Sequence, residues 1–115
     1  MSLQIYHNPR CSKSRQTLAL ITEAGHDPEI ILYLDNPPGE NKIRALIDML
    51  GFDSARDLMR RGEAVYKNLG LKSEEDENKL IKAMAQNPKL IERPIVISGA
   101  KAVLGRPPEA VLALL

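Results

Sequence analysis

Apolar and polar positions alternate along the chain in segments that predict strands and helices in a definite order. The β-prone segment LQIY at 3–6 is followed by a turn and by helix-forming residues at 12–24. The continuous apolar run EIILYL at 29–34 has the length and composition of a buried strand. A strand, a helix and a strand in close succession predict a βαβ unit whose two strands are parallel.

The middle of the chain, from about residue 40 to 91, predicts helices rather than further strands. The segment ENKIRALIDML places its apolar residues on one helical face, and Gly51 follows where a helix is expected to end. Ser54 and Asp57 form an S-x-x-D helix start. Ser73 is expected to cap a further helix over SEEDENKLIKAMAQN, because serine is a favoured residue at that position.

The end of the chain returns to strands. PIVIS at 94–98 and AVLG at 102–105, joined by GAK, predict a hairpin, and RPPEAVLALL predicts a last helix from about Pro107. The order βαβ, helices, ββα predicts an α/β fold with a four-stranded mixed sheet and a helical insertion at about 40–91. A length of 115 residues is consistent with a single domain, residues 1–115.

Composition and charge narrow the classes of function. The formal net charge is +1, so neither nucleic acid nor a membrane surface is an expected partner. No apolar run approaches the ~20 residues that span a bilayer, and the N-terminus lacks the pattern of a secretory signal. With one cysteine and two histidines, neither an internal disulfide nor a metal site is expected. We therefore expect a cytoplasmic protein, and a monomer because no apolar heptad repeat is present.

The single cysteine, Cys11, lies at the predicted junction between the first strand and its helix, where βαβ folds bind ligands. A helix N-terminus offers free N–H groups and partial positive charge, and Arg10, Lys13 and Arg15 add cations. These features favour the nucleophilic thiolate and also suit a tetrahedral oxyanion. The alternative is a small buried apolar residue, which the neighbouring proline and charges make less fitting.

A second cysteine is absent from the position at which thioredoxin-like redox helices carry one. The spacing C-x-x-C is replaced by Cys11 and Ser14, so any disulfide of this chain must be formed with another molecule. Arg93 and Arg106 each precede a proline. A cis bond at Pro94 would orient Arg93 toward a neighbouring site, whereas the alternative for each arginine is a solvated surface position.

These residues lie in motifs that resemble the single-cysteine, glutaredoxin-coupled arsenate reductases, and especially their shorter relatives. The motifs are IYHNPRCSKSR, IILYLDNPP, VYKNLGL, LIERPIVISG and GRPPEAVL, in the order of that family and over essentially the whole chain. The resemblance implies a thioredoxin-like (glutaredoxin-like), three-layer α/β domain with a helical insertion. It also implies reduction of arsenate to arsenite, with glutathione as co-substrate, glutaredoxin as electron donor and no bound cofactor.

The resemblance also assigns roles to individual residues. Cys11 matches the nucleophile of the family, and the arginines of its oxyanion site match Arg60, Arg93 and Arg106. The family's cis-proline and the histidine that favours the ionised thiol have counterparts here as well. The residues expected to tune or support the thiol, by resemblance or by their place beside it, are His7, Ser14, Arg15 and Pro94.

Two features keep alternatives open. Arg10 replaces the small residue that often precedes the cysteine in arsenate reductases. The related Spx-type transcription regulators use the same fold to bind RNA polymerase, and many carry a C-x-x-C switch that Ser14 removes here. The alternatives are therefore a thiol reductase of a different substrate and an Spx-like regulatory or binding module. A phosphatase loop, C-x5-R, is excluded because its arginine position is Thr17.

Overall fold

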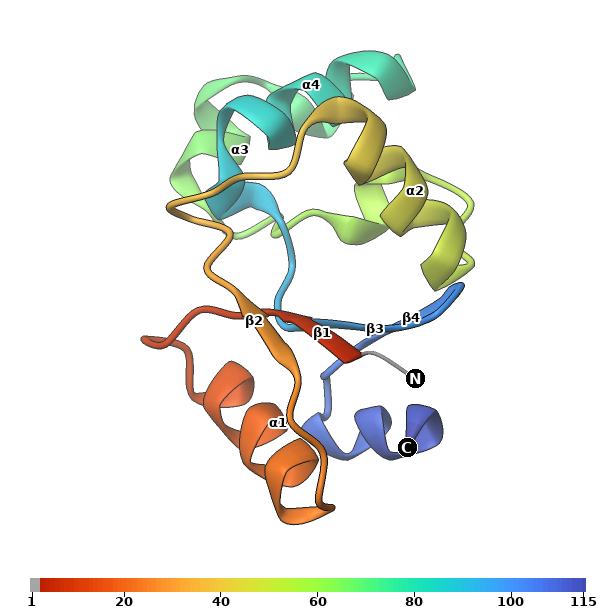
Figure 1. The fold of residues 1–115 in the computed structure, drawn as a ribbon. Coiled ribbons are helices and arrows are strands. Elements are labelled where there is room, and N and C mark those ends of the chain that lie inside the picture. The colour runs from red at the N-terminus through yellow and green to blue at the C-terminus, as the bar shows by residue number, and fades with distance from the viewer. Residues whose placement is uncertain (1–2) are drawn as a thin grey trace. The chain divides into compact units, whose positions relative to one another are not determined.

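The computed structural model describes residues 3–115, which form two compact units. The sheet unit consists of the N-terminal segment through Asn36 together with Arg93–Leu115, and the helical unit consists of Pro37–Glu92. The four strands of the described chain belong to the sheet unit. The helices α2 (Glu40–Leu50), α3 (Ala64–Asn68) and α4 (Glu77–Gln86) belong to the helical unit (Figure 1). Among the described residues, no helix has both the length and the apolar character needed to cross a membrane.

The four strands of the sheet unit lie in the order β2-β1-β3-β4. β1 (Leu3–Tyr6) pairs in parallel with β2 (Glu29–Ile31) and antiparallel with β3 (Ile95–Ser98), which pairs antiparallel with β4 (Lys101–Leu104). The predicted α/β class with a mixed four-stranded sheet is therefore confirmed. The hairpin of β3 and β4 is also confirmed, and its turn is Gly99–Ala100.

One face of the sheet packs against α1 (Ser12–Glu23) and the 3-10 helix η4 (Pro108–Leu114), which lie side by side in Figure 1. Ile5 of β1 and Val96 of β3 are paired directly across the ladder, and both are fully buried. Burial of one side chain of this size stabilises a fold by about 1.5–3 kcal/mol. The core residues of this layer are Leu3, Ile5, Ile21, Val96 and Val111.

The apolar run EIILYL does not form the buried strand that its composition predicts. Only Glu29–Ile31 is a strand, and it lies at the edge of the sheet. The chain then turns, and the N–H groups of Asp35 and Asn36 both donate to the carbonyl oxygen of Leu32. Tyr33 is buried within this turn, whereas its apolar neighbours are exposed. The prediction failed because an apolar run does not distinguish a central strand from an edge strand followed by a turn.

The helical unit packs around the apolar faces of its helices. The residues at the centre of this packing are fully buried and include Ile43, Leu46, Leu80 and Met84. Its elements are α2 (Glu40–Leu50), η1 (Ala55–Leu58), α3 (Ala64–Asn68), η2 (Leu71–Ser73), α4 (Glu77–Gln86) and η3 (Pro88–Leu90).

The sequence predicts the end of one helix and the start of another in this unit, and only the first prediction is confirmed. Gly51 ends α2 in the left-handed region, with φ of 74°, and its N–H donates to the carbonyl oxygen of Asp48, as the sequence predicts. The predicted cap Ser73 is wrong. Asp76 caps α4 instead, and its carboxylate accepts the N–H of Asn78 at 2.9 Å. Ser73 belongs to η2, so the acidic segment after it is a loop and its last residue becomes the cap.

Candidate functional site

Cys11 is the N-cap residue of α1 and follows the turn that leaves β1. Its backbone is extended, with φ of −95° and ψ of 122°, and its carbonyl oxygen accepts the N–H of Arg15 at 3.0 Å. The N–H of Cys11 donates to the carbonyl oxygen of Asn8 at 3.0 Å, which closes the turn. The thiol group is therefore carried at a helix N-terminus, where free N–H groups and the helix dipole stabilise an anion.

Arg106 reaches this thiol from the bend between β4 and η4. Its Nη2 donates to Sγ of Cys11 across 3.8 Å, and its Nε donates to the carbonyl oxygen of Arg93 at 2.8 Å. The second contact fixes the direction of the guanidinium. The guanidinium thereby places a positive charge next to the sulfur atom. The structure thus brings together three residues that sequence reasoning had placed in one site.

The position of Arg106 depends on close packing at Gly105. A Cβ atom there would lie 2.4 Å from Oγ1 of Thr17 and 2.7 Å from Cγ of Pro94, distances that real Cβ atoms do not adopt. The N–H of Gly105 also donates to the carbonyl oxygen of Pro94 at 2.9 Å. Sequence reasoning missed the roles of Gly105 and Thr17. The available signal was a glycine immediately before the arginine in GRPP.

Arg93 presents a buried donor that lacks an acceptor. Its Nε has no hydrogen-bond partner among residues 3–115. An unsatisfied buried donor costs about 1–3 kcal/mol, and an oxyanion bound at this place would supply the missing acceptor. The peptide bonds that precede Pro94 and Pro107 are both cis. The cis bond expected at Pro94 is thereby confirmed.

His7 and Ser14 form a buried polar pair beside the loop. Nδ1 of His7 lies 2.6 Å from Oγ of Ser14, which also accepts the N–H of Asn8 at 3.0 Å. Burial lowers the pKa of His7, and the positive charge of Arg15 lowers it further. The neutral imidazole therefore predominates at pH 7. Within the described part of the chain, His7 makes its side-chain hydrogen bond to Ser14 and not to the thiol.

The other cations of the loop are exposed. Nη1 of Arg15 donates to the carbonyl oxygen of Pro9 at 2.9 Å, which ties the first turn of α1 back to the loop. Arg10 is held through its backbone, because its N–H donates to Oδ1 of Asn8 at 3.0 Å. These side chains and Lys13 leave the loop positively charged on its solvent side. These cations can act on the thiol only through their charge, because among the described residues it is Arg106 that donates a hydrogen bond to Sγ.

Arg60 lies in the helical unit, where two carboxylates hold it. Nη1 is 2.8 Å from Oε1 of Glu63, and Nε is 3.2 Å from Oε1 of Glu92. The backbone N–H of Arg60 donates to the carbonyl oxygen of Leu90 at 2.7 Å, which places the side chain beside Glu92. The convergence of Arg60 on Cys11 stays a prediction. Nη2 takes part in neither of these ion pairs.

A hollow of about 380 Å³ lies beside the thiol loop. Loop residues His7, Asn8, Pro9 and Arg10 form one wall, and Leu32, Leu34 and Asp35 from the turn after β2 form the other. Its volume lies in the range of small-molecule sites. Sequence reasoning missed this hollow because it assigned Leu32 and Leu34 to a buried strand. Among residues 3–115, no group of three or more His, Cys, Asp or Glu side chains is arranged to hold a metal ion.

The chain is similar to known proteins over nearly its whole length. The model of the ArsC family matches residues 6–114. An arsenate reductase of Haemophilus influenzae is 47% identical over 116 residues, which cover 100% of both chains. The uncharacterised protein YfgD of Escherichia coli K12 is 55% identical over 111 residues, 96% of this chain and 93% of that protein. The solved structure of an arsenate reductase from Vibrio cholerae has a TM-score of 0.97 and 48% identity, and the match covers 100% of this chain and 98% of that one. This likeness confirms the thioredoxin-like α/β fold.

Proposed function

Because this chain belongs to the ArsC family, we propose that it reduces arsenate to arsenite with the thiol of Cys11 as nucleophile. The observation that carries the proposal is the contact of 3.8 Å between Nη2 of Arg106 and Sγ, at the N-terminus of α1. Arsenate is a tetrahedral oxyanion. Arginine forks and free helix N–H groups bind such anions, so the same groups support both the thiolate and its substrate.

In the first step, the Cys11 thiolate attacks arsenic, a sulfur–arsenic bond forms, and one arsenate oxygen leaves as water. Arg106 offsets the negative charge next to the forming bond. Nε of Arg93 donates to an arsenate oxygen and thereby gains the acceptor that it lacks without substrate. Resemblance to the family adds Arg60 as a third arginine, and within the helical unit Glu63 and Glu92 hold its guanidinium.

The electrons of the reduction must come from outside the chain, because Cys11 is its only cysteine and Ser14 occupies the resolving position. Glutathione condenses with the bound arsenic, and a second oxygen leaves as water. The glutaredoxin thiol then attacks the glutathione sulfur, which breaks the bond between this sulfur and arsenic. Arsenic gains two electrons, and the two donor thiols become a mixed disulfide. Water finally displaces Cys11 and releases arsenite, so the starting thiol is regenerated.

The test is a coupled assay of NADPH consumption that contains the protein, arsenate, glutathione, glutaredoxin and glutathione reductase. We expect arsenate-dependent oxidation that falls to background in Cys11→Ser. Ser12→Ala is the matched control, since it changes the exposed neighbour of the thiol and should keep the activity.

No arsenate-dependent oxidation, with the Cys11 thiol shown to be free by titration, would contradict the proposal. That result would favour a thiol reductase of a different substrate or an Spx-like binding module. Disulfide exchange with model glutathione disulfides separates these two, because only the reductase turns over.

A further inference from the structure

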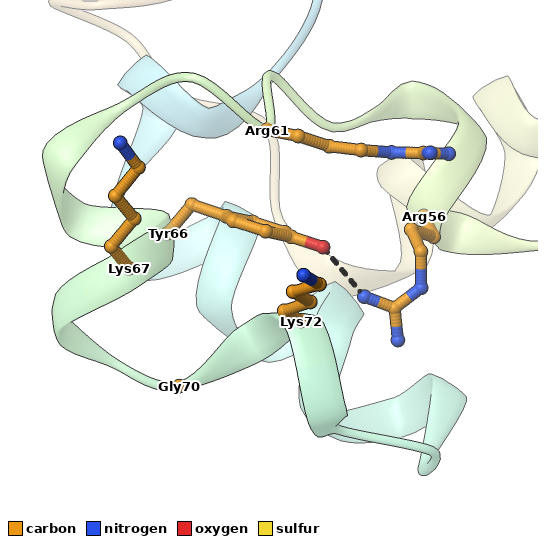
Figure 2. A pocket seen from close by; sticks show the side chains of 6 residues that line it. All are labelled: Arg56, Arg61, Tyr66, Lys67, Gly70 and Lys72. Atoms are coloured by element: carbon orange, nitrogen blue, oxygen red, sulfur yellow. Dashed lines mark hydrogen bonds between the residues drawn. The ribbon is translucent and has the colours of Figure 1, made fainter.

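A concave and positively charged site lies wholly within the helical unit. This basic pocket has a volume of about 560 Å³ (Figure 2). Its walls are formed by Arg56, Arg61, Tyr66, Lys67, Gly70 and Lys72. Four of these side chains are cations and none is acidic. The whole chain has a formal net charge of only +1, so the excess is a local feature rather than a consequence of a basic protein.

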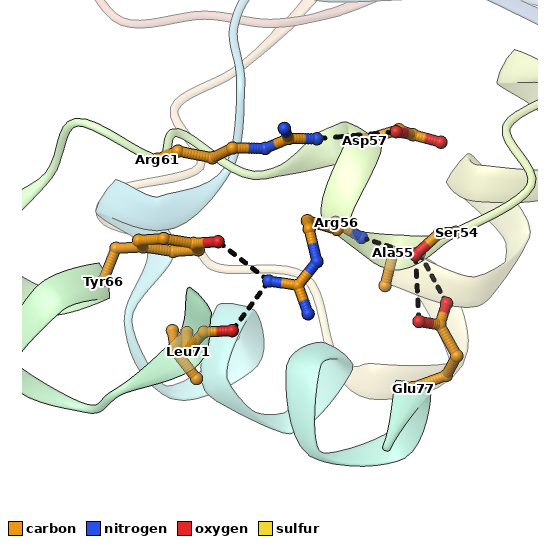
Figure 3. Close-up of polar contacts among 8 residues, drawn as sticks. All are labelled: Ser54, Ala55, Arg56, Asp57, Arg61, Tyr66, Leu71 and Glu77. Carbon is orange, nitrogen blue, oxygen red and sulfur yellow. Dashed lines mark hydrogen bonds and ion pairs between the residues drawn. The ribbon is translucent and has the colours of Figure 1, made fainter. Parts of the chain in front are cut away.

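Arg56 is fixed in the wall of the basic pocket by uncharged acceptors. Its Nη1 donates to the hydroxyl of Tyr66 at 2.8 Å and to the carbonyl oxygen of Leu71 at 2.7 Å (Figure 3). Its Nη2 donates to the carbonyl oxygen of Glu74. None of these acceptors carries a full charge. The partly buried guanidinium is thus held in one orientation while its positive charge is not neutralised.

The segment that carries Arg56 is itself anchored. Ser54 caps η1 by accepting the N–H of Arg56 at 3.2 Å. The carboxylate of Glu77, from α4, accepts from Oγ of Ser54 at 2.9 Å and from the N–H of Ala55 at 2.7 Å (Figure 3). Two elements of the helical unit therefore hold the backbone of Arg56 in place. Such preorganisation lowers the entropic cost of binding an anion at its side chain.

The remaining cations of the basic pocket are weakly paired or not paired. Arg61 forms an ion pair with Asp57 at 3.6 Å, and both side chains are about half exposed, so solvent screens the pair. Lys67 and Lys72 are exposed and form no ion pair with any residue of the described chain. Three of the four cations in the wall, namely Arg56 and both lysines, are therefore without a carboxylate partner.

The turn between α3 and η2 brings the two lysines to one pocket. Gly70 lies in the left-handed region with φ of 65°, a conformation that glycine adopts without strain. Lys67 precedes this turn, Lys72 follows it, and both line the same wall as the buried Tyr66 (Figure 2). Both lysines therefore add positive charge to the lining of the pocket, with Lys67 on the far side of Tyr66 from Arg56 (Figure 2).

We propose that the basic pocket binds a small organic anion with at least two phosphate or carboxylate groups. Its residues differ from the arginines predicted to bind arsenate, and the proposal does not depend on arsenate reduction. A volume of this size is typical of small-molecule sites and exceeds the needs of one tetrahedral ion. Arg56 supplies a fixed positive charge, with the N–H donors that its protein contacts leave over, for one anionic group, and the lysines supply point charges for a second.

The test uses pyrophosphate and citrate as probes, titrated into the full chain at constant ionic strength. Binding is followed by calorimetry and by backbone amide chemical shifts. We expect saturable shifts centred on the segment from Tyr66 to Lys72. In the double variant Lys67→Gln, Lys72→Gln we expect a dissociation constant that is larger by roughly tenfold or more, since two charge-assisted contacts are lost. A response to pyrophosphate alone would assign phosphate groups, and a response to citrate alone would assign carboxylates.

The matched control is the double variant Lys82→Gln, Lys89→Gln, which removes the same charge from exposed lysines of the same unit outside the pocket. It should bind both probes as the parent does. Equal weakening in the two double variants would show general charge attraction and overturn the proposal. Shifts dispersed over all lysines, or no saturable shifts with either probe, would overturn it as well. Both variants change only exposed side chains, so loss of the fold does not obscure the result.

Discussion

The two positively charged regions of this protein differ in what their cations face. Around Cys11, Arg106 donates directly to a thiol, and the buried Nε of Arg93 lacks an acceptor. In the basic pocket, Arg56 is fixed by a phenol and by backbone carbonyl oxygens, and no thiol lines the wall. The first arrangement supports attack on a bound anion. The second supports binding alone, because the side chains are placed to attract charge.

Arg56 and Arg60 carry the same charge but differ in the residues that contact them. Arg60 is paired with Glu63 and Glu92, which offset its charge, whereas the acceptors of Arg56 are neutral. An anion that approaches Arg60 meets two carboxylates that already compete for the guanidinium. Among the described residues, no carboxylate competes with an anion that approaches Arg56, because its acceptors are a hydroxyl and carbonyl oxygens. The number of arginines in a segment therefore does not locate an anion site, since their partners decide the outcome.

Substitutions in the two regions are expected to differ most in their effect on catalysis. Arg106→Ala should lower kcat/KM for arsenate by roughly 10²–10³, because a charged donor next to the reacting sulfur is lost. Arg106→Lys should recover only part of this, since lysine keeps the charge and loses the planar fork. Steady-state rates in the coupled assay measure both. Arg61→Ala is the matched control from the basic pocket and should leave the rate unchanged, and equal losses in the two alanine variants would contradict the comparison.

A smaller effect is expected on stability, at the glycine that places Arg106. Gly105→Ala should lower the free energy of unfolding by about 1–3 kcal/mol, because the new Cβ overlaps Thr17 and Pro94. Gly62→Ala is the control, since its added Cβ meets nothing within 4 Å. Chemical denaturation measures both variants. If Gly105→Ala is as stable as the control, close packing does not set the position of Arg106.

The sequence predicts the strand–helix core because that core follows from local patterns. The turn after β1 places Cys11 at the start of α1, where the β-prone segment LQIY gives way to helix-forming residues. The edge position of β2 was not predictable in the same way. Whether Ile30 is buried depends on which strands flank β2. The apolar sequence of β2 does not reveal the order of the strands. The cap of α4 was missed because Ser73 and Asp76 are both good N-cap residues in sequence, and only the backbone of η2 decides between them.

The candidate site was predictable in its residue types and incompletely in its geometry. Motif resemblance pointed to Cys11, Arg93 and Arg106, which the sheet unit brings together. The close approach of Thr17 to Gly105 joins residues far apart in the chain, so no local pattern reports it. The basic pocket was missed for a different reason. Its cations come from separate elements, and the neutral partners of Arg56 are backbone atoms that a sequence does not display.

The smallest expected effect is a pH dependence confined to the thiol region, since the basic pocket has no histidine in its wall. Burial and Arg15 lower the pKa of His7 below its usual 6.5, so the unfolded chain binds this proton more readily than the folded one. Stability from this group is therefore complete above pH 6.5 and declines as the pH falls through the lowered value. Denaturation of His7→Gln from pH 7.5 to 5 should show a weaker decline than the parent. His26→Gln, which alters the exposed second histidine, should keep the parental slope. If stability depends on pH in His7→Gln as it does in the parent, burial of the neutral His7 is not the cause of that pH dependence.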